Sequence, residues 1–356
     1  MAEKIDQQLV ENVMFEKIRD VDRYYQSIQY ILGLKFYLEK HKELKAKFIG
    51  AEVVLTRTNL EKVNPDVCVQ VTKDSLGEIG LPIEIKSSLS TDKDVFSKLK
   101  KMERYNDGLK GWETSSGKID EEAIVFSPYV EDVGRALKVL NNSISNKALV
   151  FKKELLIWQW SLVQSLKDPN RENLLVQQIY GSLSKRSSSF NEVICDGIKQ
   201  DINEISLIIE KERNLFTNQK PPVEYTMLML WQNVFGRVLN ENNNIISKEK
   251  VTEIVNKYYT DSIMKNPQNK EYKFKVAWAE EALKMFKNIG LAENIGSEYS
   301  IKLNCNKKDI KKHFCTKAAI YEIKKGVHSD KLKDSKNAPL ASFKSKNKKL
   351  FQNENK

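Results

Sequence analysis

The stretch NPDVCVQVTKDSLGEIGLPIEIKSS, residues 64–88, contains two short runs rich in β-branched residues, with turn-prone residues between them. Side chains alternate along a strand, so Asp66 lies on the face opposite to the three valines of the first run. The same rule places Glu84 and Lys86 opposite to the two isoleucines of the second run. We therefore expect an antiparallel pair of strands with one apolar face and one charged face.

The charged face of this pair has residue types that suit a metal site. If the strands pair, Asp66 and Glu84 approach each other at one end of the sheet, and the two carboxylates repel unless a cation lies between them. Mg²⁺ accepts one or two carboxylates together with water and substrate phosphate. Lys86 can then orient or help to deprotonate a metal-activated water and stabilise charge on the phosphorane. The pattern predicts phosphodiester hydrolysis; the alternative is a structural hairpin with surface charges.

The sequence on either side of this stretch predicts an α/β sandwich. Residues 5–48 read as helices, with apolar residues at helical spacing, and a third β-branched run, AEVVLTRT, precedes the quoted stretch. Helical spacing returns in residues 94–106, EEAIVFSP reads as a strand, and VEDVGRALKVLNN reads as a helix. The predicted order over residues 25–141 is helix, three strands, helix, strand, helix.

Within this order, Pro65-Asp66 followed by Glu84-Ile85-Lys86 resembles the motif of the PD-(D/E)XK nuclease superfamily, which includes many restriction enzymes and Holliday-junction resolvases. The Glu-x-Lys triplet occurs five times in the chain, but only the copy at Glu84 follows a Pro-Asp strand at hairpin distance. The resemblance implies a restriction-endonuclease-like α/β/α core and Mg²⁺, with Mn²⁺ as a substitute. It also implies that Asp66, Glu84 and the backbone carbonyl of Ile85 hold the metal, while Lys86 assists the water.

Several residues near the motif have both a functional and a structural interpretation. Many members of the superfamily use a further acid from the first helix, and Glu39 and Glu43 are the candidates there. Glu16, in the helix before it, and Glu52, at the start of the first strand, are further candidates. Lys98, Lys101 and Tyr105 follow the motif, and their side chains face either substrate or solvent. Ser87 and Ser88 either contact a phosphate or form a turn.

The rest of the chain divides by its sequence pattern into further segments. Residues 1–145 are expected to form the nuclease-like domain. Residues 146–220 read as a mostly helical connecting region that ends at a Lys-Pro-Pro break, although ALVFKKELLIWQW could begin as a strand. Residues 221–325 contain three amphipathic helices followed by a short strand, an order that resembles a winged-helix DNA-binding domain. A plain helical bundle and a partner-docking domain fit the same pattern. Residues 326–356 are rich in Lys, Ser and Asn and read as a disordered basic tail.

Composition restricts the protein to a few classes. The chain has 356 residues, 40% hydrophobic and 30% charged, without the apolar run of a membrane span or a secretory signal, so we expect a cytoplasmic protein. The four scattered cysteines are expected to be reduced thiols. The net charge of +11 comes from residues 301–356, which can attract phosphate or only keep the protein soluble.

Together these patterns predict a metal-dependent DNA endonuclease, with restriction or anti-phage defence as the first biological role. RNA stays open as a substrate, and a homodimer or a partner protein is compatible with double-strand cutting. The alternatives are a nuclease of repair, recombination or transposition, and a non-catalytic nucleic-acid-binding or scaffold protein that retains the nuclease fold.

Overall fold

The computed structural model describes most of the chain between residues 6 and 326. The described residues are 6–51, 55–57, 61–73, 77–107, 109–110, 113–114, 117–118, 120–121, 123–164, 172–182, 189–201, 216–217, 220–240, 243–259, 274–303 and 308–326. The predicted basic tail, from residue 327 onward, lies outside them. Within the described ranges, no helix combines the length and the apolar character needed to cross a membrane.

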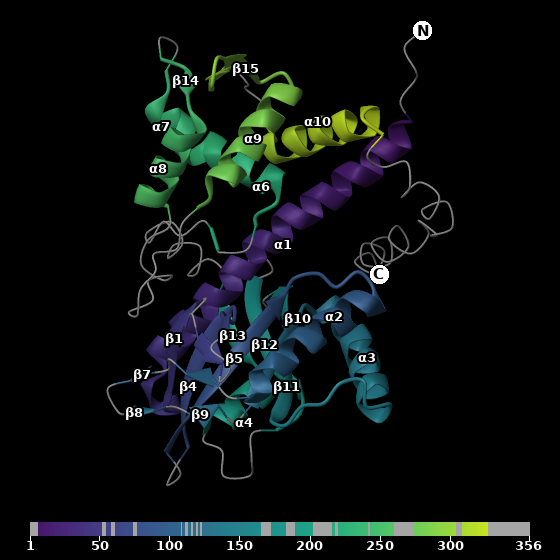
Figure 1. The fold of residues 1–356 in the computed structure, drawn as a ribbon, viewed down its shortest axis with the longest axis vertical. Helices are drawn as coiled ribbons and strands as arrows, with labels where there is room; N and C mark the ends of the chain where they lie inside the picture. Colours follow the sequence, from purple (N-terminus) through teal and green to yellow (C-terminus); the bar gives the residue numbers. More distant parts are fainter. Residues whose placement is uncertain are drawn as a thin grey trace, which may run out of the picture.

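A curled, mixed sheet forms the centre of the first part of the chain (Figure 1). The spatial order of its strands is β1-β4-β5-β10-β11-β12-β13, with β9 beside β5. β5, β10 and β11 are parallel, and the other neighbours along this path are antiparallel. The strands are β1 (Ala46–Ala51), β4 (Val67–Lys73), β5 (Gly77–Lys86), β9 (Asp120–Glu121), β10 (Ala123–Pro128), β11 (Glu154–Gln164), β12 (Glu172–Tyr180) and β13 (Ile198–Asp201).

Short strands form two smaller sheets beside this one, β3-β2-β6 and β7-β8. Their bounds are β2 (Leu55–Arg57), β3 (Lys62–Val63), β6 (Leu109–Lys110), β7 (Glu113–Thr114) and β8 (Gly117–Lys118). The predicted strand AEVVLTRT contains β2, which lies in the small sheet, whereas the strand beside β4 is β1, in a segment predicted to be mostly helical. The structure confirms the coarser prediction of a mixed α/β arrangement.

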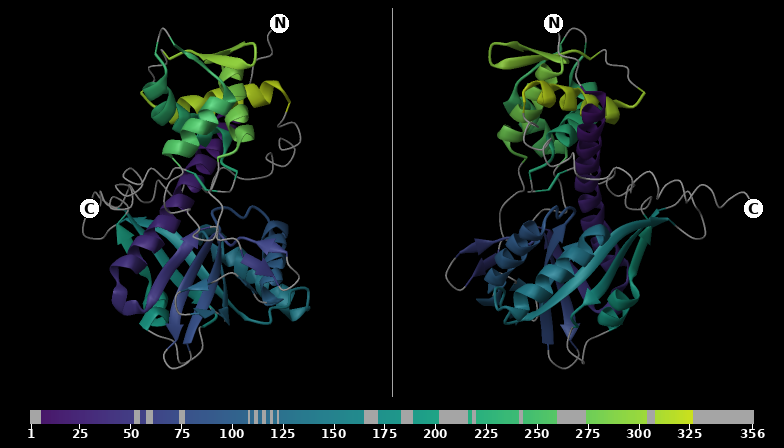
Figure 2. Two further views of the ribbon diagram at one scale, coloured as in Figure 1. Left: turned by 60° about the vertical axis from the view of Figure 1, so that its left-hand side comes forward. Right: turned by 90° about the vertical axis from the view of Figure 1, so that its right-hand side faces the viewer.

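Helices cover both faces of the large sheet. α1 (Gln7–Lys40) lies against one face, where it shares a hydrophobic core with β4, β5, β10 and β11. α2 (Asp92–Met102) and α3 (Val133–Ser145) lie on the other face and form a second core with opposite-facing side chains of β4, β10 and β11. Figure 2 shows the sheet between these two layers. Each central strand is therefore buried on both sides, as is usual for parallel strands with helical connections.

The prediction of a helical connecting region over residues 146–220 is wrong. The segment supplies β11, β12 and β13, and its only described helix is α4 (Ser189–Asp196), which packs on β12. Residues 155–158 are all apolar because their side chains enter the two cores in turn. The run therefore lacks the alternation of apolar and polar residues that identifies a half-buried strand. The large sheet therefore extends past the expected domain boundary at residue 145.

The C-terminal half alternates helices with short strands. α6 (Val223–Met229) continues through a π-helical turn, η5 (Leu230–Phe235), into α7 (Gly236–Val238). The remaining elements are β14 (Ile245–Ile246), α8 (Lys248–Tyr258), α9 (Val276–Asn288), β15 (Ala292–Ile295), β16 (Glu298–Ile301) and α10 (Ile310–Lys324). The three strands form an antiparallel sheet in the order β14-β16-β15. The three predicted helices are present, and the predicted single strand is instead a hairpin paired with β14.

The long helix α1 joins the two halves of the molecule. It packs against β1 of the large sheet and against α6 and α10 of the C-terminal half, as Figure 1 shows. At that second contact the Lys17 ammonium lies 2.7 Å from Glu224 Oε1 on α6 and 2.6 Å from Glu322 Oε1 on α10. The Glu224 side chain is only 7% exposed, so a buried ion pair ties the three helices together.

Candidate functional site

The start of β4 and the end of β5 bring the predicted site residues together. The two strands are antiparallel, and their register pairs Val67 with Ile83. Asp66 is the residue before β4, so this register places it opposite Glu84. The predicted pairing of the two runs is confirmed.

Alternation along β4 and β5 separates apolar from charged side chains as predicted. Val67 and Ile83 face the core beneath α1, whereas Cys68 belongs to the core beneath α2 and α3. Glu84 and Lys86 alternate with Ile83 and Ile85, and therefore point toward the α2 side. Because helices cover that side too, the charges lie in a largely buried layer.

The three predicted side chains form one ion cluster. The Lys86 ammonium lies 2.9 Å from Asp66 Oδ2 and 2.9 Å from Glu84 Oε2, so it bridges the two carboxylates. The Ile85 amide donates a second hydrogen bond to Asp66 Oδ2, at 2.6 Å. The side chains of Asp66, Glu84 and Lys86 are 11%, 12% and 15% exposed. Low exposure strengthens each of these charge-assisted contacts and also makes an unpaired charge costly.

The other oxygen of Glu84 is held by Tyr105. α2 ends at Met102, and the 3-10 turn η3 (Glu103–Asp107) directs the Tyr105 ring inward, where it is fully buried. The Tyr105 hydroxyl donates a hydrogen bond to Glu84 Oε1. Both oxygens of Glu84 are thus occupied, one by Tyr105 and the other by Lys86.

Burial and pairing move the pKa values of the cluster in different directions. Burial raises the pKa of Asp66, and the positive charge of Lys86 opposes this rise only in part. Burial also acts to raise the pKa of Glu84, but Lys86 and the hydrogen bond from Tyr105 outweigh it and lower that pKa. Burial acts to lower the pKa of Lys86, but the two carboxylates reverse this effect and raise it. The two carboxyl groups therefore titrate apart, a pattern common in active sites.

Residues after the motif divide between site and surface. Tyr105, for which substrate or solvent contact was expected, instead supports Glu84 from the core. Lys98 is partly buried, and its pKa is lowered by burial and by repulsion from Lys86, whereas Lys101 is exposed. Arg104 was not predicted: its positive charge contributes to the lowered pKa of Glu84. Sequence spacing did not reveal Arg104 because its position depends on the end of α2 and the turn that follows.

The predicted further acid from the first helix stays a prediction. Glu39 lies 3.9 Å from Lys35 and is exposed, and Glu43 lies 3.1 Å from His41 Nδ1. Glu16 is exposed on α1, and Glu52 lies outside the described residues. α1 instead brings Tyr30 near the site, since the charge of Asp66 adds to the effect of burial in raising the Tyr30 pKa.

The donor set at the cluster fits a hard cation with few protein ligands. Within the described ranges, no three His, Cys, Asp or Glu side chains gather closely enough to hold a metal by themselves. Asp66 and Glu84 supply two carboxylates around a position that the Lys86 ammonium already fills. Mg²⁺ commonly uses one or two carboxylates and completes its shell with water and phosphate. Ile85 contributes its amide to Asp66, and the predicted ligation by its carbonyl stays a prediction.

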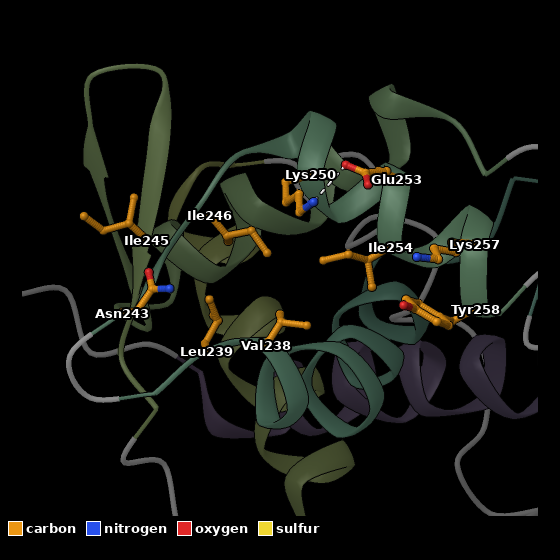
Figure 3. Close-up of a pocket in the computed structure, with 10 residues that line it drawn as sticks. All are labelled: Val238, Leu239, Asn243, Ile245, Ile246, Lys250, Glu253, Ile254, Lys257 and Tyr258. Atoms are coloured by element: carbon orange, nitrogen blue, oxygen red, sulfur yellow. Dashed lines mark hydrogen bonds and ion pairs between the residues drawn. The ribbon is translucent and has the colours of Figure 1, made fainter.

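A separate groove lies in the C-terminal half, between α7 and α8. Its volume is about 300 Å³, and Figure 3 shows its apolar and charged side chains. The apolar lining includes Val238, Leu239, Ile246, Ile254 and Tyr258, with Lys250 and Glu253 paired at the rim. The groove shares no residue with the Asp66 cluster.

No family model, no curated protein and no solved structure matches this chain. Assignment of chemistry to the Asp66 cluster therefore rests on its residues and their geometry.

Proposed function

We propose that the chain is a metal-dependent endonuclease that hydrolyses phosphodiester bonds, with DNA as the preferred substrate. The observation that carries this proposal is the convergence of Asp66, Glu84 and Lys86 at the meeting point of β4 and β5. Three charged side chains from two strands, largely buried and bridged to one another, cost free energy to bury, and structural hairpins rarely require them. Their residue types and sequence order also match the motif of the PD-(D/E)XK nucleases.

Each residue has a role in this proposal that follows from its position. Asp66 and Glu84 would hold Mg²⁺, and the Ile85 amide keeps the Asp66 carboxylate oriented. Mg²⁺, when bound, would lower the pKa of a water and neutralise charge on the phosphate. Lys86 lies on the same face as both acids and would orient that water and stabilise the negative charge that develops on phosphorus oxygens.

The C-terminal half supports nucleic-acid binding through its topology. The order α6, β14, α8, α9, β15, β16 with one three-stranded sheet resembles that of a winged helix, in which the third helix commonly enters the major groove. The exposed side of α9, however, carries Glu280 and Glu281, which pair with lysines at Lys248, Lys284 and Lys220. This charge balance favours contacts with the duplex from other parts of the chain, because phosphate attraction needs unpaired positive charge.

The central experiment compares the cleavage of supercoiled DNA by wild type, Asp66→Ala and Glu84→Gln in the presence of Mg²⁺ or Mn²⁺. We expect nicked and linear products from wild type and at least a hundredfold slower cleavage by both variants, since each loses a charged metal ligand. Asp92→Ala is a matched control, because Asp92 is an exposed carboxylate on α2 that pairs only with Arg135 and Lys138 in the described structure. Its cleavage rate should equal that of wild type. Equal cleavage by wild type and Asp66→Ala would remove the site assignment.

A second variant, Lys86→Ala, separates binding from turnover. It should retain metal and DNA binding while losing turnover; loss of binding along with activity would make Lys86 a structural or phosphate-anchoring residue. Wild type should also be tested on single-stranded DNA and on RNA. A wild type that cleaves none of these substrates, while still binding DNA, would favour the non-catalytic alternative.

A further inference from the structure

The Lys86 ammonium holds the position that a metal ion needs. It lies 2.9 Å from one oxygen of Asp66 and 2.9 Å from one oxygen of Glu84, and its positive charge balances part of their repulsion. Neighbouring carboxylates repel each other, and in this structure the chain itself provides a cation between them.

The contacts of Glu84 show which group has to leave when a metal arrives. Tyr105 holds Oε1 and Lys86 holds Oε2, so a new ligand on Glu84 replaces one of them. The Tyr105 ring is fully buried in the core beneath α2 and α3, together with Leu99 and Phe126. Moving that ring would disturb a packed core. The lysine side chain is a flexible four-carbon stem with a single charged end and is 15% exposed, so its ammonium can move more readily than the fully buried ring.

We propose that Lys86 is the resident cation of the metal-free site and that a divalent metal binds by displacing its ammonium from between Asp66 and Glu84. The inference rests on the proposed metal site and adds a competition within it. Tyr105 acts as a positioning residue, which keeps Glu84 Oε1 engaged and presents Oε2 to the incoming ion. The displaced ammonium remains on the same strand, beside the metal, where the substrate phosphate would lie.

The competition can be measured without substrate. Mn²⁺ binding is measured by the loss of the free Mn²⁺ electron paramagnetic resonance signal, for wild type, Lys86→Met and Lys98→Met. Lys98 is the matched control: it is a partly buried lysine whose pKa is influenced by Lys86, but it makes no ion pair with the described residues. Its substitution removes a nearby positive charge without emptying the position between the carboxylates.

We expect Lys86→Met to bind Mn²⁺ at least about tenfold more tightly than wild type, since the metal no longer replaces two charge-assisted hydrogen bonds. Lys98→Met should stay within about threefold of wild type, because it only removes a charge at longer range. Unchanged or weaker binding by Lys86→Met, or an equal gain in both variants, overturns the displacement.

A measurement on wild type alone covers the case in which Lys86→Met does not fold. Lysine acetylation is quantified by mass spectrometry at low reagent dose, with and without Mg²⁺. Displacement predicts that Mg²⁺ increases the labelling of Lys86 at least about threefold while Lys98 changes little, since the ammonium leaves its two carboxylates. Unchanged labelling of Lys86 at a metal concentration that saturates binding overturns the inference. If neither wild type nor Lys86→Met binds Mn²⁺, the proposed function fails together with the displacement. If both bind Mn²⁺ with equal affinity, only the displacement of Lys86 by the metal is refuted.

Discussion

Substitution of Lys17 by Met should weaken the packing between the two halves of the molecule more than substitution of any exposed charged residue. Lys17 on α1 bridges Glu224 on α6 and Glu322 on α10, and the Glu224 side chain is 7% exposed. Methionine keeps most of the volume and removes the charge, so Glu224 would remain buried without its partner. Removing one partner of a buried ion pair costs about 3–5 kcal/mol. We expect a loss near the lower end, about 3 kcal/mol, because Glu322 is 21% exposed and can turn toward water.

The control is Lys311→Met. Lys311 on α10 pairs with Asp22 on α1 at 2.9 Å, so it joins two of the same helices, but both side chains are more than one-third exposed, at 37% and 43%. Exposed pairs contribute about 0–1 kcal/mol. Urea unfolding, followed by tryptophan fluorescence and far-UV circular dichroism, gives the free energy of unfolding and shows whether the two probes coincide. Equal losses below about 1 kcal/mol in the two variants would refute the reasoning that burial of Glu224 sets the cost.

The ion pairs of Lys17 also predict how the free energy of unfolding depends on pH. Burial acts to lower the pKa of Lys17, but Glu224 and Glu322 outweigh it and raise the pKa above 10.5. A raised pKa in the folded state gives stability that is complete below the unfolded value and is lost as the pH rises through the folded value. The margin between wild type and Lys17→Met should therefore be constant between pH 7 and about 10 and shrink at higher pH. A margin that already shrinks between pH 7 and 9 would contradict this sign.

Two further predictions concern the core. Tyr105→Phe removes the hydrogen-bond donor to the buried Glu84 carboxylate and should lower the free energy of unfolding in urea by about 1.5–3 kcal/mol. Tyr30→Phe loses a neutral 3.0 Å hydrogen bond with Ser127 and should lower it by about 0.5–1.5 kcal/mol. Equal losses would argue against a charged partner of Tyr105. Gly181→Ala should lower thermal stability by the equivalent of about 2 kcal/mol or more, since φ is +74° and a Cβ would meet a backbone oxygen, whereas Gly134→Ala on α3 has open space and should be neutral or stabilising.

The sequence was sufficient for the centre of the sheet because local pattern and packing agree there. Alternation along residues 64–88 predicted which side chains share a face, and the register Val67 to Ile83 then brought Asp66 to Glu84. The bridging geometry of Lys86 follows from the same alternation, since it is two residues beyond Glu84 on one strand.

Other features depend on distant contacts that leave no local pattern. The residues around Trp158 and Trp160 form a strand with both faces buried, so their apolar run resembles a buried helix. The position of Tyr105 is decided by where α2 ends and by the turn that follows. The two-residue strand β14 is stabilised by its pairing with β16, more than fifty residues later, and its own sequence is too short to predict it.

The packing of α1 against α10 has a consequence for how the protein is made. Ribosomes release the chain from its N-terminus, so Val13 and Met14 of α1 emerge about three hundred residues before Phe314 and Cys315, which share their core. During that interval α1 can pack against the sheet but not against α10. The apolar side of α1 that packs against α10 stays open to chaperones or to another nascent chain until α10 is synthesised. Variants truncated before residue 310 should therefore expose this apolar side and aggregate, even though every strand of the large sheet is present.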